Sequence, residues 1–112
     1  MARLLGRSKA LELICTGDRI PAAEEERIGL VSKVVPAENL MAASEELARK
    51  MMSRSPVAVR AAMEAVNFGL DMPFEQGQFL EAALFGLLCA TEDMKEGMAA
   101  FLEKRQANFP GR

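Results

Sequence analysis

Histidine, tyrosine and tryptophan are absent from this 112-residue chain, and six phenylalanines are its only aromatic residues. The lack of histidine excludes Ser-His-Asp chemistry and most zinc sites within these residues, because both depend on imidazole. Half of the residues are apolar, mostly Ala, Leu, Met and Val. Straight-chain residues lose little rotamer freedom in a helix, whereas aromatic and β-branched residues prefer strands. The composition therefore favours a mainly α domain, at a length that supports one small core but no roomy enclosed active site.

Long apolar runs, basic patches and paired cysteines are also missing. No run approaches the ~20 apolar residues that cross a bilayer, and the apolar stretch in residues 1–6 is too short for a signal peptide. Acids and bases are interleaved at a net charge of −2, so we expect no nucleic-acid binding. Cys15 and Cys89 lie in apolar helical stretches outside any CxxC pair, which predicts two buried thiols in a reducing compartment. We expect a cytoplasmic protein without a membrane or metal site.

Helix-start and helix-stop signals divide the chain into successive helices. Ser8 is a candidate N-cap for a first helix that Gly17 ends, and Pro21 precedes a short acidic helix that ends at Gly29. Apolar residues recur at helical spacing in the four segments that follow: 39–53, 55–70, 73–88 and 91–102. In residues 74–88 they cover most of the circumference. That helix is expected to be buried on more than one side, as at a subunit interface.

One short strand is predicted at residues 30–35. The segment Leu30-Val31-Ser32-Lys33-Val34-Val35 is rich in β-branched residues and is bounded by Gly29 and Pro36. A lone strand cannot satisfy its own backbone N–H and C=O groups, and no other segment is predicted to pair with it. We therefore expect either that the chain is part of a larger fold or that the strand pairs with another copy.

Two groups of residues could carry chemistry. Glu24, Glu25 and Glu26 are adjacent, and adjacent helical residues point about 100° apart, so a solvated first turn is favoured over an acid/base pair. Phe101 and Lys104 are spaced i, i+3 and share one side of the last helix. An aromatic face beside an ammonium suits a nucleotide, since the ring contacts adenine and the cation meets phosphate. Taken by itself, this common spacing favours a core phenylalanine beside a solvated lysine.

A series of short motifs runs along the whole chain. In order, they are Gly6-Arg7-Ser8-Lys9-Ala10, Thr16-Gly17-Asp18-Arg19-Ile20, Gly29-Leu30-Val31-Ser32-Lys33-Val34-Val35-Pro36, Ser55-Pro56-Val57-Ala58 and Thr91-Glu92-Asp93-Met94-Lys95-Glu96-Gly97-Met98-Ala99-Ala100-Phe101-Leu102-Glu103-Lys104-Arg105. In this order they resemble the helical C-terminal region of the enoyl-CoA hydratase/isomerase (crotonase) family. The last segment is the most specific, because it is similar to the family's T/S-x-D-x-x-E-G-x-x-A-F-x-E-K-R signature.

The resemblance implies a fold of two parts, an N-terminal spiral of ββα units and a C-terminal helical region that builds trimers, often paired into hexamers. Residues 1–112 resemble the helical region, with the spiral domain absent. Phe101 and Lys104 match the family's residues that reach the adenine and phosphate region of CoA, usually in a neighbouring subunit's site. The family's oxyanion-hole N–H groups and two catalytic glutamates belong to the spiral. No catalytic residue is therefore carried over, and Glu12 and Glu24 do not match those positions.

The leading hypothesis is a member of this family whose complete form hydrates trans-2-enoyl-CoA, with acyl-CoA as substrate and no cofactor. Because the two glutamates are not among these residues, the chain alone is expected to be inactive. The alternative is a non-catalytic helical oligomerisation or interaction module. Its exposed apolar surface would be covered by self-association, as a trimer, a hexamer or a swapped dimer. Hydratase or isomerase chemistry and acyl-chain length are set by residues of the spiral part.

Overall fold

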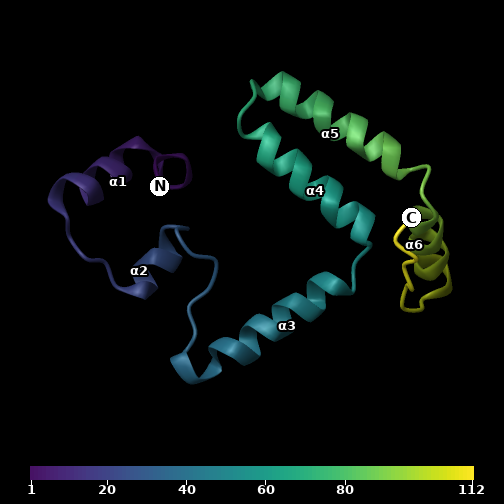
Figure 1. The fold of residues 1–112 in the computed structure, drawn as a ribbon, viewed down its shortest axis with the longest axis horizontal. Coiled ribbons are helices and arrows are strands. Elements are labelled where there is room, and N and C mark those ends of the chain that lie inside the picture. Colours follow the sequence, from purple (N-terminus) through teal and green to yellow (C-terminus); the bar gives the residue numbers. More distant parts are fainter. The chain divides into compact units, whose positions relative to one another are not determined.

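The computed structural model describes all 112 residues, and its regular elements are helices (Figure 1). They are α1 (Ala2–Thr16), α2 (Ala22–Arg27), the 3₁₀ turn η1 (Ala37–Asn39), α3 (Leu40–Met52), α4 (Pro56–Gly69), α5 (Phe74–Leu88) and α6 (Glu92–Glu103). The chain forms two compact units, Met1–Ser44 and Glu45–Arg112. None of the helices combines the length and apolar character that a membrane crossing requires. The predicted mainly α fold is confirmed.

Local capping signals set most helix ends where the sequence predicts them. α1 ends at Gly17, which adopts the left-handed conformation with φ 68° and ψ 14°. At the start of α4 the Ser55 hydroxyl accepts a hydrogen bond from Ala58 N–H at 3.1 Å. At the start of α6 the Thr91 hydroxyl accepts one from Met94 N–H at 3.1 Å. These helices therefore begin and end at residues whose own chemistry favours it.

The N-terminal helix departs from the prediction. The sequence predicts a start at Ser8, but helical structure already begins at Ala2. Gly6 interrupts it with φ 75° and ψ 166°, backbone values that glycine alone adopts readily. α1 is therefore two short helices joined at a break, and Ser8 lies in the first turn after that break rather than at the N-cap. Ala10, further along the second segment, is buried.

The strand predicted at residues 30–35 is not formed. Residues 30–32 make a bend, and residues 33–36 have no regular structure. Gly29, with φ 77°, turns the chain at the end of α2. The N–H groups of Leu30 and Val31 then donate to Glu25 O at 2.9 and 3.3 Å. Two donors that a ladder would need are thus used to close α2, and residues 1–112 contain no strand to pair with the rest.

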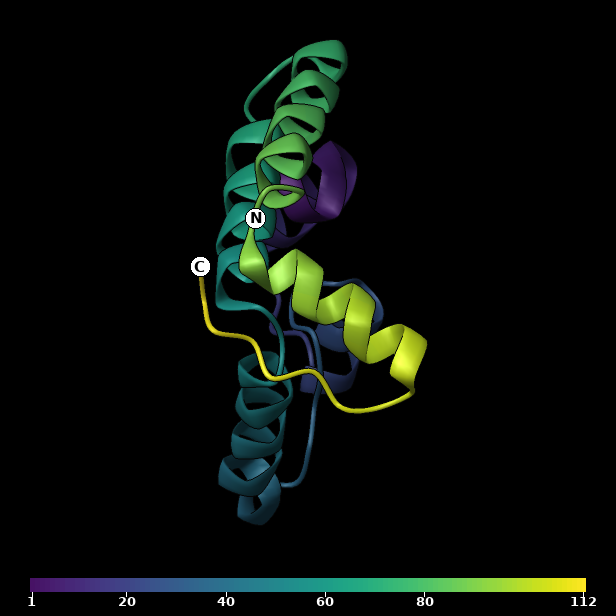
Figure 2. The same cartoon turned by 90° about the vertical axis from the view of Figure 1, so that its right-hand side faces the viewer.

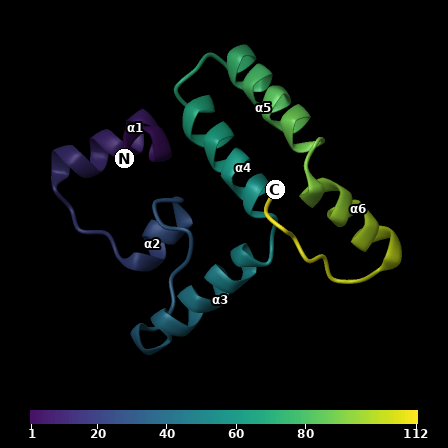
Figure 3. The same cartoon turned by 45° about the vertical axis from the view of Figure 1, so that its right-hand side comes forward.

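In the second unit, α4 and α5 pack side by side as an antiparallel pair (Figures 1 and 3). Gly77 of α5 faces Gly69 of α4. A β-carbon placed on Gly77 would lie 3.5 Å from the Gly69 carbonyl oxygen, in van der Waals contact, so the two helices lie close together at this point. The short connection between the helices favours this antiparallel arrangement. α6 follows, and the residues after it run back along it (Figure 2).

Few side chains are buried within either unit. The buried apolar residues are all alanines: Ala10, Ala61 and Ala100. α5 has no buried residue, and its Phe79 and Leu87 are 78% and 70% exposed. Cys15 and Cys89, predicted to be buried, are exposed free thiols. The prediction was wrong because it assumed that each apolar helical stretch has a partner within the chain, and these faces have none.

Candidate functional site

The last helix is anchored to α4 through a buried aspartate. Asp93 is 3% exposed, and its carboxylate accepts hydrogen bonds from the Ser55 hydroxyl at 2.5 Å and from Gly111 N–H at 2.7 Å. Its backbone N–H, one of the donors that a helix's first turn leaves unpaired, donates to Arg112 O at 3.1 Å. Because Ser55 also caps α4, one carboxylate joins the starts of α4 and α6 to the end of the chain.

Residues 105–112, called the tail here, run back along α6 (Figures 2 and 3). Glu96 of α6 accepts two hydrogen bonds from the Arg105 guanidinium, at 2.6 and 2.9 Å. The same carboxylate accepts a third from Asn108 N–H at 2.7 Å. The Phe109 ring lies over Gly97, where a β-carbon would be 3.5 Å from the ring. The tail is therefore fixed to α6 by charge-assisted hydrogen bonds and by one aromatic contact.

The charged form of Glu96 is favoured by these contacts. Hydrogen bonds from Arg105 and then from Asn108 N–H lower the pKa of Glu96 from 4.5 to about 2. Glu96 and Glu103 in turn raise the pKa of Arg105, and Glu103 lies 2.6 Å from its Nε. Two carboxylates thus hold Arg105, whereas the adjacent Lys104 has no ion-pair partner. Of these two neighbouring cations, Lys104 is the one available to an anion.

Lys104 ends α6 in a left-handed conformation, with φ 53° and ψ 39°. It is the one residue other than glycine with a positive φ. Lys104 N–H donates to Phe101 O at 3.3 Å and Arg105 N–H to Ala100 O at 3.0 Å, the bond pair of a Schellman motif. Glycine usually occupies this position, because a β-carbon is crowded in left-handed backbone. A lysine at a strained position is a candidate for a functional side chain.

Phe101 lies on the last turn of α6, one turn before Lys104, and is 83% exposed. It borders an apolar groove of about 640 Å³ that α6 forms with the start of α4 and the end of α5. Met98, Phe85 and Leu88 are among the other side chains that line this groove. The structure thus presents both members of the predicted pair at the surface. In this chain Phe101 is not a core residue, so the simpler sequence interpretation is wrong for it.

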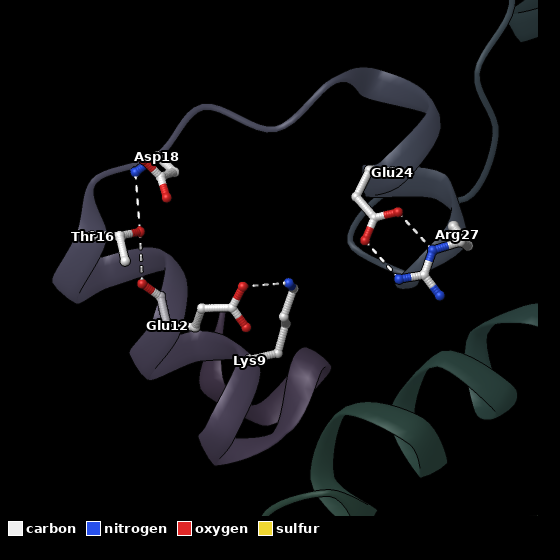
Figure 4. Close-up of polar contacts among 6 residues, drawn as sticks. All are labelled: Lys9, Glu12, Thr16, Asp18, Glu24 and Arg27. Atoms are coloured by element: carbon white, nitrogen blue, oxygen red, sulfur yellow. Dashed lines mark hydrogen bonds and ion pairs between the residues drawn. The ribbon is translucent and has the colours of Figure 1, made fainter.

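Two carboxylates of the first unit, Glu12 and Glu24, are paired with cations of their own helices (Figure 4). Glu24 accepts two hydrogen bonds from the Arg27 guanidinium at 2.6 Å each, and Lys9 Nζ lies 2.9 Å from Glu12 Oε1. The hydrogen bonds from Arg27 lower the pKa of Glu24. A carboxylate held ionised in this way is a poor proton donor at neutral pH. These are the i, i+3 pairs of helix surfaces, and no cluster of His, Cys, Asp or Glu is arranged to hold a metal.

Two polar contacts that hold α6 in place are not evident from the sequence, namely Asp93 with Ser55 and Glu96 with Arg105. Asp93 and Ser55 are 38 residues apart, and in its own segment each is typical of the start of a helix. Glu96 and Arg105 are nine residues apart, beyond the spacing at which helical side chains meet. They come together only because the chain reverses its direction at Lys104. A glycine at this position would have indicated the reversal, but the sequence has a lysine there.

Comparison with known proteins gives a consistent result. The family model of enoyl-CoA hydratase/isomerase matches residues 1–112. The chain is 44% identical over 109 residues to the mitochondrial enoyl-CoA hydratase of Pongo abelii, covering 97% of this chain and 38% of that protein. It is 45% identical over 109 residues to the crotonyl-CoA hydratase of Syntrophomonas wolfei, covering 97% and 42%. The crystal structure of enoyl-CoA hydratase from Bacillus anthracis matches it with a TM-score of 0.94 at 40% identity, over 99% of this chain and 43% of that one. The chain thus spans about two fifths of the length of these relatives.

Proposed function

Because the chain belongs to the enoyl-CoA hydratase/isomerase family, we propose that it is the helical C-terminal region of an enzyme that hydrates trans-2-enoyl-CoA thioesters. The observation that carries this proposal is the family match over residues 1–112 together with the named hydratases among its relatives. Hydration needs an oxyanion hole for the thioester and two carboxylates that handle the water and the proton. The carboxylates described above are engaged in helix pairs or in fixing the tail. We assign the acid/base residues to the spiral domain that complements these helices.

Within residues 1–112 the proposed ligand contact is Phe101 with Lys104. The phenylalanine offers an exposed ring to the adenine of CoA, and the lysine offers an unpaired ammonium to a phosphate. Arg105 is engaged by two carboxylates, which leaves Lys104 as the cation for this role. The substrate is an acyl-CoA, and no cofactor enters the proposal.

The hydratase proposal is tested by assaying water addition to crotonyl-CoA with two proteins. The 112-residue chain alone should show no turnover, and a chimaera that places the N-terminal part of the Syntrophomonas wolfei enzyme before Met1 should be active. The same N-terminal part without residues 1–112 is the control. Turnover by the chain alone at the ordinary enzymatic range of about 1–10³ s⁻¹ would contradict the assignment of the carboxylates. A folded but inactive chimaera would contradict the assignment of the helices.

The CoA contact is tested by titrating CoA against the chain and against Lys104→Ala. Loss of a charge-assisted bond to phosphate should weaken binding by about ten-fold. Lys95→Ala is the matched control, because Lys95 is an exposed lysine on a different side of α6 and its loss changes the net charge equally. Equal affinity in the wild type and Lys104→Ala would remove Lys104 from the site, and equal losses in both variants would indicate only non-specific charge attraction.

A second copy of the chain is the proposed partner, as in a trimer or hexamer, or in a swapped dimer of these residues alone. The apolar faces of α5, with Phe79 and Leu87 uncovered, support this proposal and also favour the alternative function of a non-catalytic oligomerisation module. A monomer at high concentration by light scattering would count against both. The two free thiols, Cys15 and Cys89, suit a reducing compartment, and we place the protein in the cytoplasm.

A further inference from the structure

The backbone at Lys104 is held from both sides. On the helix side, Lys104 N–H donates to Phe101 O at 3.3 Å, and Arg105 N–H donates to Ala100 O at 3.0 Å. On the tail side, the Glu96 carboxylate accepts hydrogen bonds from the Arg105 guanidinium and from Asn108 N–H. A left-handed residue that carries a β-carbon is strained, and it persists only where the surrounding structure leaves it no alternative. The carboxylate of Glu96 is the group that holds the tail side.

We propose that Glu96 is a positioning residue for the CoA contact. By holding Arg105 and Asn108, it fixes the reversal of the chain and so directs the Lys104 side chain toward the phosphate. This inference rests on the proposed function of Lys104. It adds that the lysine depends on a carboxylate that does not touch the ligand.

Glu96 has a second effect on the same contact. Its side chain is 21% exposed and, with that of Glu103, neutralises Arg105, the cation next to Lys104. An unpaired guanidinium there would offer phosphate a competing partner in a different place. Glu96 thus keeps one cation in the site and fixes its direction, which is a specificity role as well as a structural one.

The test combines CoA affinity with a double-mutant cycle of Glu96→Ala and Lys104→Ala. Glu96→Ala should weaken CoA binding by about five- to thirty-fold, because binding would then have to fix the backbone of one residue that the substitution has freed. In the Lys104→Ala background the same change should cause no further loss of affinity, because Glu96 acts through the lysine. Glu96→Gln, which keeps an oxygen acceptor, should recover part of the affinity. Unchanged or tighter binding of Glu96→Ala, or an equal loss in the Lys104→Ala background, would overturn the proposal.

A matched control and a readout without ligand complete the design. Glu92→Ala removes another α6 carboxylate that pairs with the tail, at Arg112 (2.8 Å), and should leave CoA affinity unchanged. Trypsin cleaves after Lys104 and Arg105 only when the backbone there is free, so cleavage should be faster in Glu96→Ala than in the wild type or Glu92→Ala. Equal cleavage rates in all three proteins would overturn the proposed role of Glu96, whatever their CoA affinities are. Faster cleavage with equal CoA affinity in the wild type and Lys104→Ala would instead refute the proposed CoA contact, and the positioning role with it.

Discussion

Substitutions of Lys104 should change the stability of the fold and the affinity for CoA independently of each other. With φ 53° and ψ 39°, Lys104 is in a conformation that costs a residue with a β-carbon roughly 1–2 kcal/mol. Glycine avoids this cost but gives the unfolded chain additional freedom, about 0.4–1 kcal/mol. The difference predicts that Lys104→Gly is more stable than Lys104→Ala by about 0.5–1 kcal/mol. Both variants lack the ammonium, so both should lose CoA affinity to the same extent.

The assay is urea unfolding followed by far-UV circular dichroism, with CoA titrations on the same preparations. The matched control is the pair Lys95→Gly and Lys95→Ala, in the interior of α6, where glycine should be the less stable variant by about 1 kcal/mol. The sign of the difference between glycine and alanine should therefore reverse between the two positions. If glycine is the less stable variant at both, Lys104 is not strained, and the argument that its side chain is kept for a function fails.

Two further predictions concern the carboxylates of α6. Asp93→Ala removes the acceptor of two hydrogen bonds and leaves the Ser55 O–H group without an acceptor in a site where Ser55 is 7% exposed, so it should lower the free energy of unfolding by about 2–4 kcal/mol in urea titrations. A change no larger than that of Glu92→Ala would show that the buried contact does not form. For Glu96, a pKa lowered from 4.5 to about 2 means that its contribution to stability is complete above about pH 5 and is lost as the pH falls through 2. Between pH 5 and pH 2 the unfolding midpoint of Glu96→Gln should consequently fall less than that of the wild type, and parallel pH profiles would refute this.

Much of the fold follows from local sequence because helix ends are local events. Ser55, Thr91 and Gly17 each act on the backbone within a few residues, and the structure confirms all three. The strand at residues 30–35 failed because a strand requires a second strand, which the composition of one segment cannot supply. The predicted burial of Cys15 and Cys89 failed for a related reason, since burial depends on what covers a helix face.

The candidate site was predictable only in part. The spacing of Phe101 and Lys104, together with the family resemblance, singled out the pair, and the structure has Phe101 in the last turn of α6 and Lys104 at its C-cap. The groups that support them could not be predicted, because Asp93 and Ser55 meet across 38 residues and Glu96 meets Arg105 only after the reversal. That reversal occurs at a lysine, and lysine carries no signal for left-handed backbone.

The hydrogen bonds of the two units link residues at different separations in the sequence, and this difference predicts how each unit unfolds on heating. In Met1–Ser44 the bonds described above, such as Lys9 to Glu12 and Leu30 to Glu25, link residues close in sequence. In Glu45–Arg112 the Asp93 carboxylate joins distant segments, so the opening of one disturbs the others. Local bonds break one at a time, whereas linked segments unfold together. Heating should therefore produce a broad, gradual loss of helix from the first unit and a sharper transition from the second, with slow amide exchange concentrated around the starts of α4 and α6.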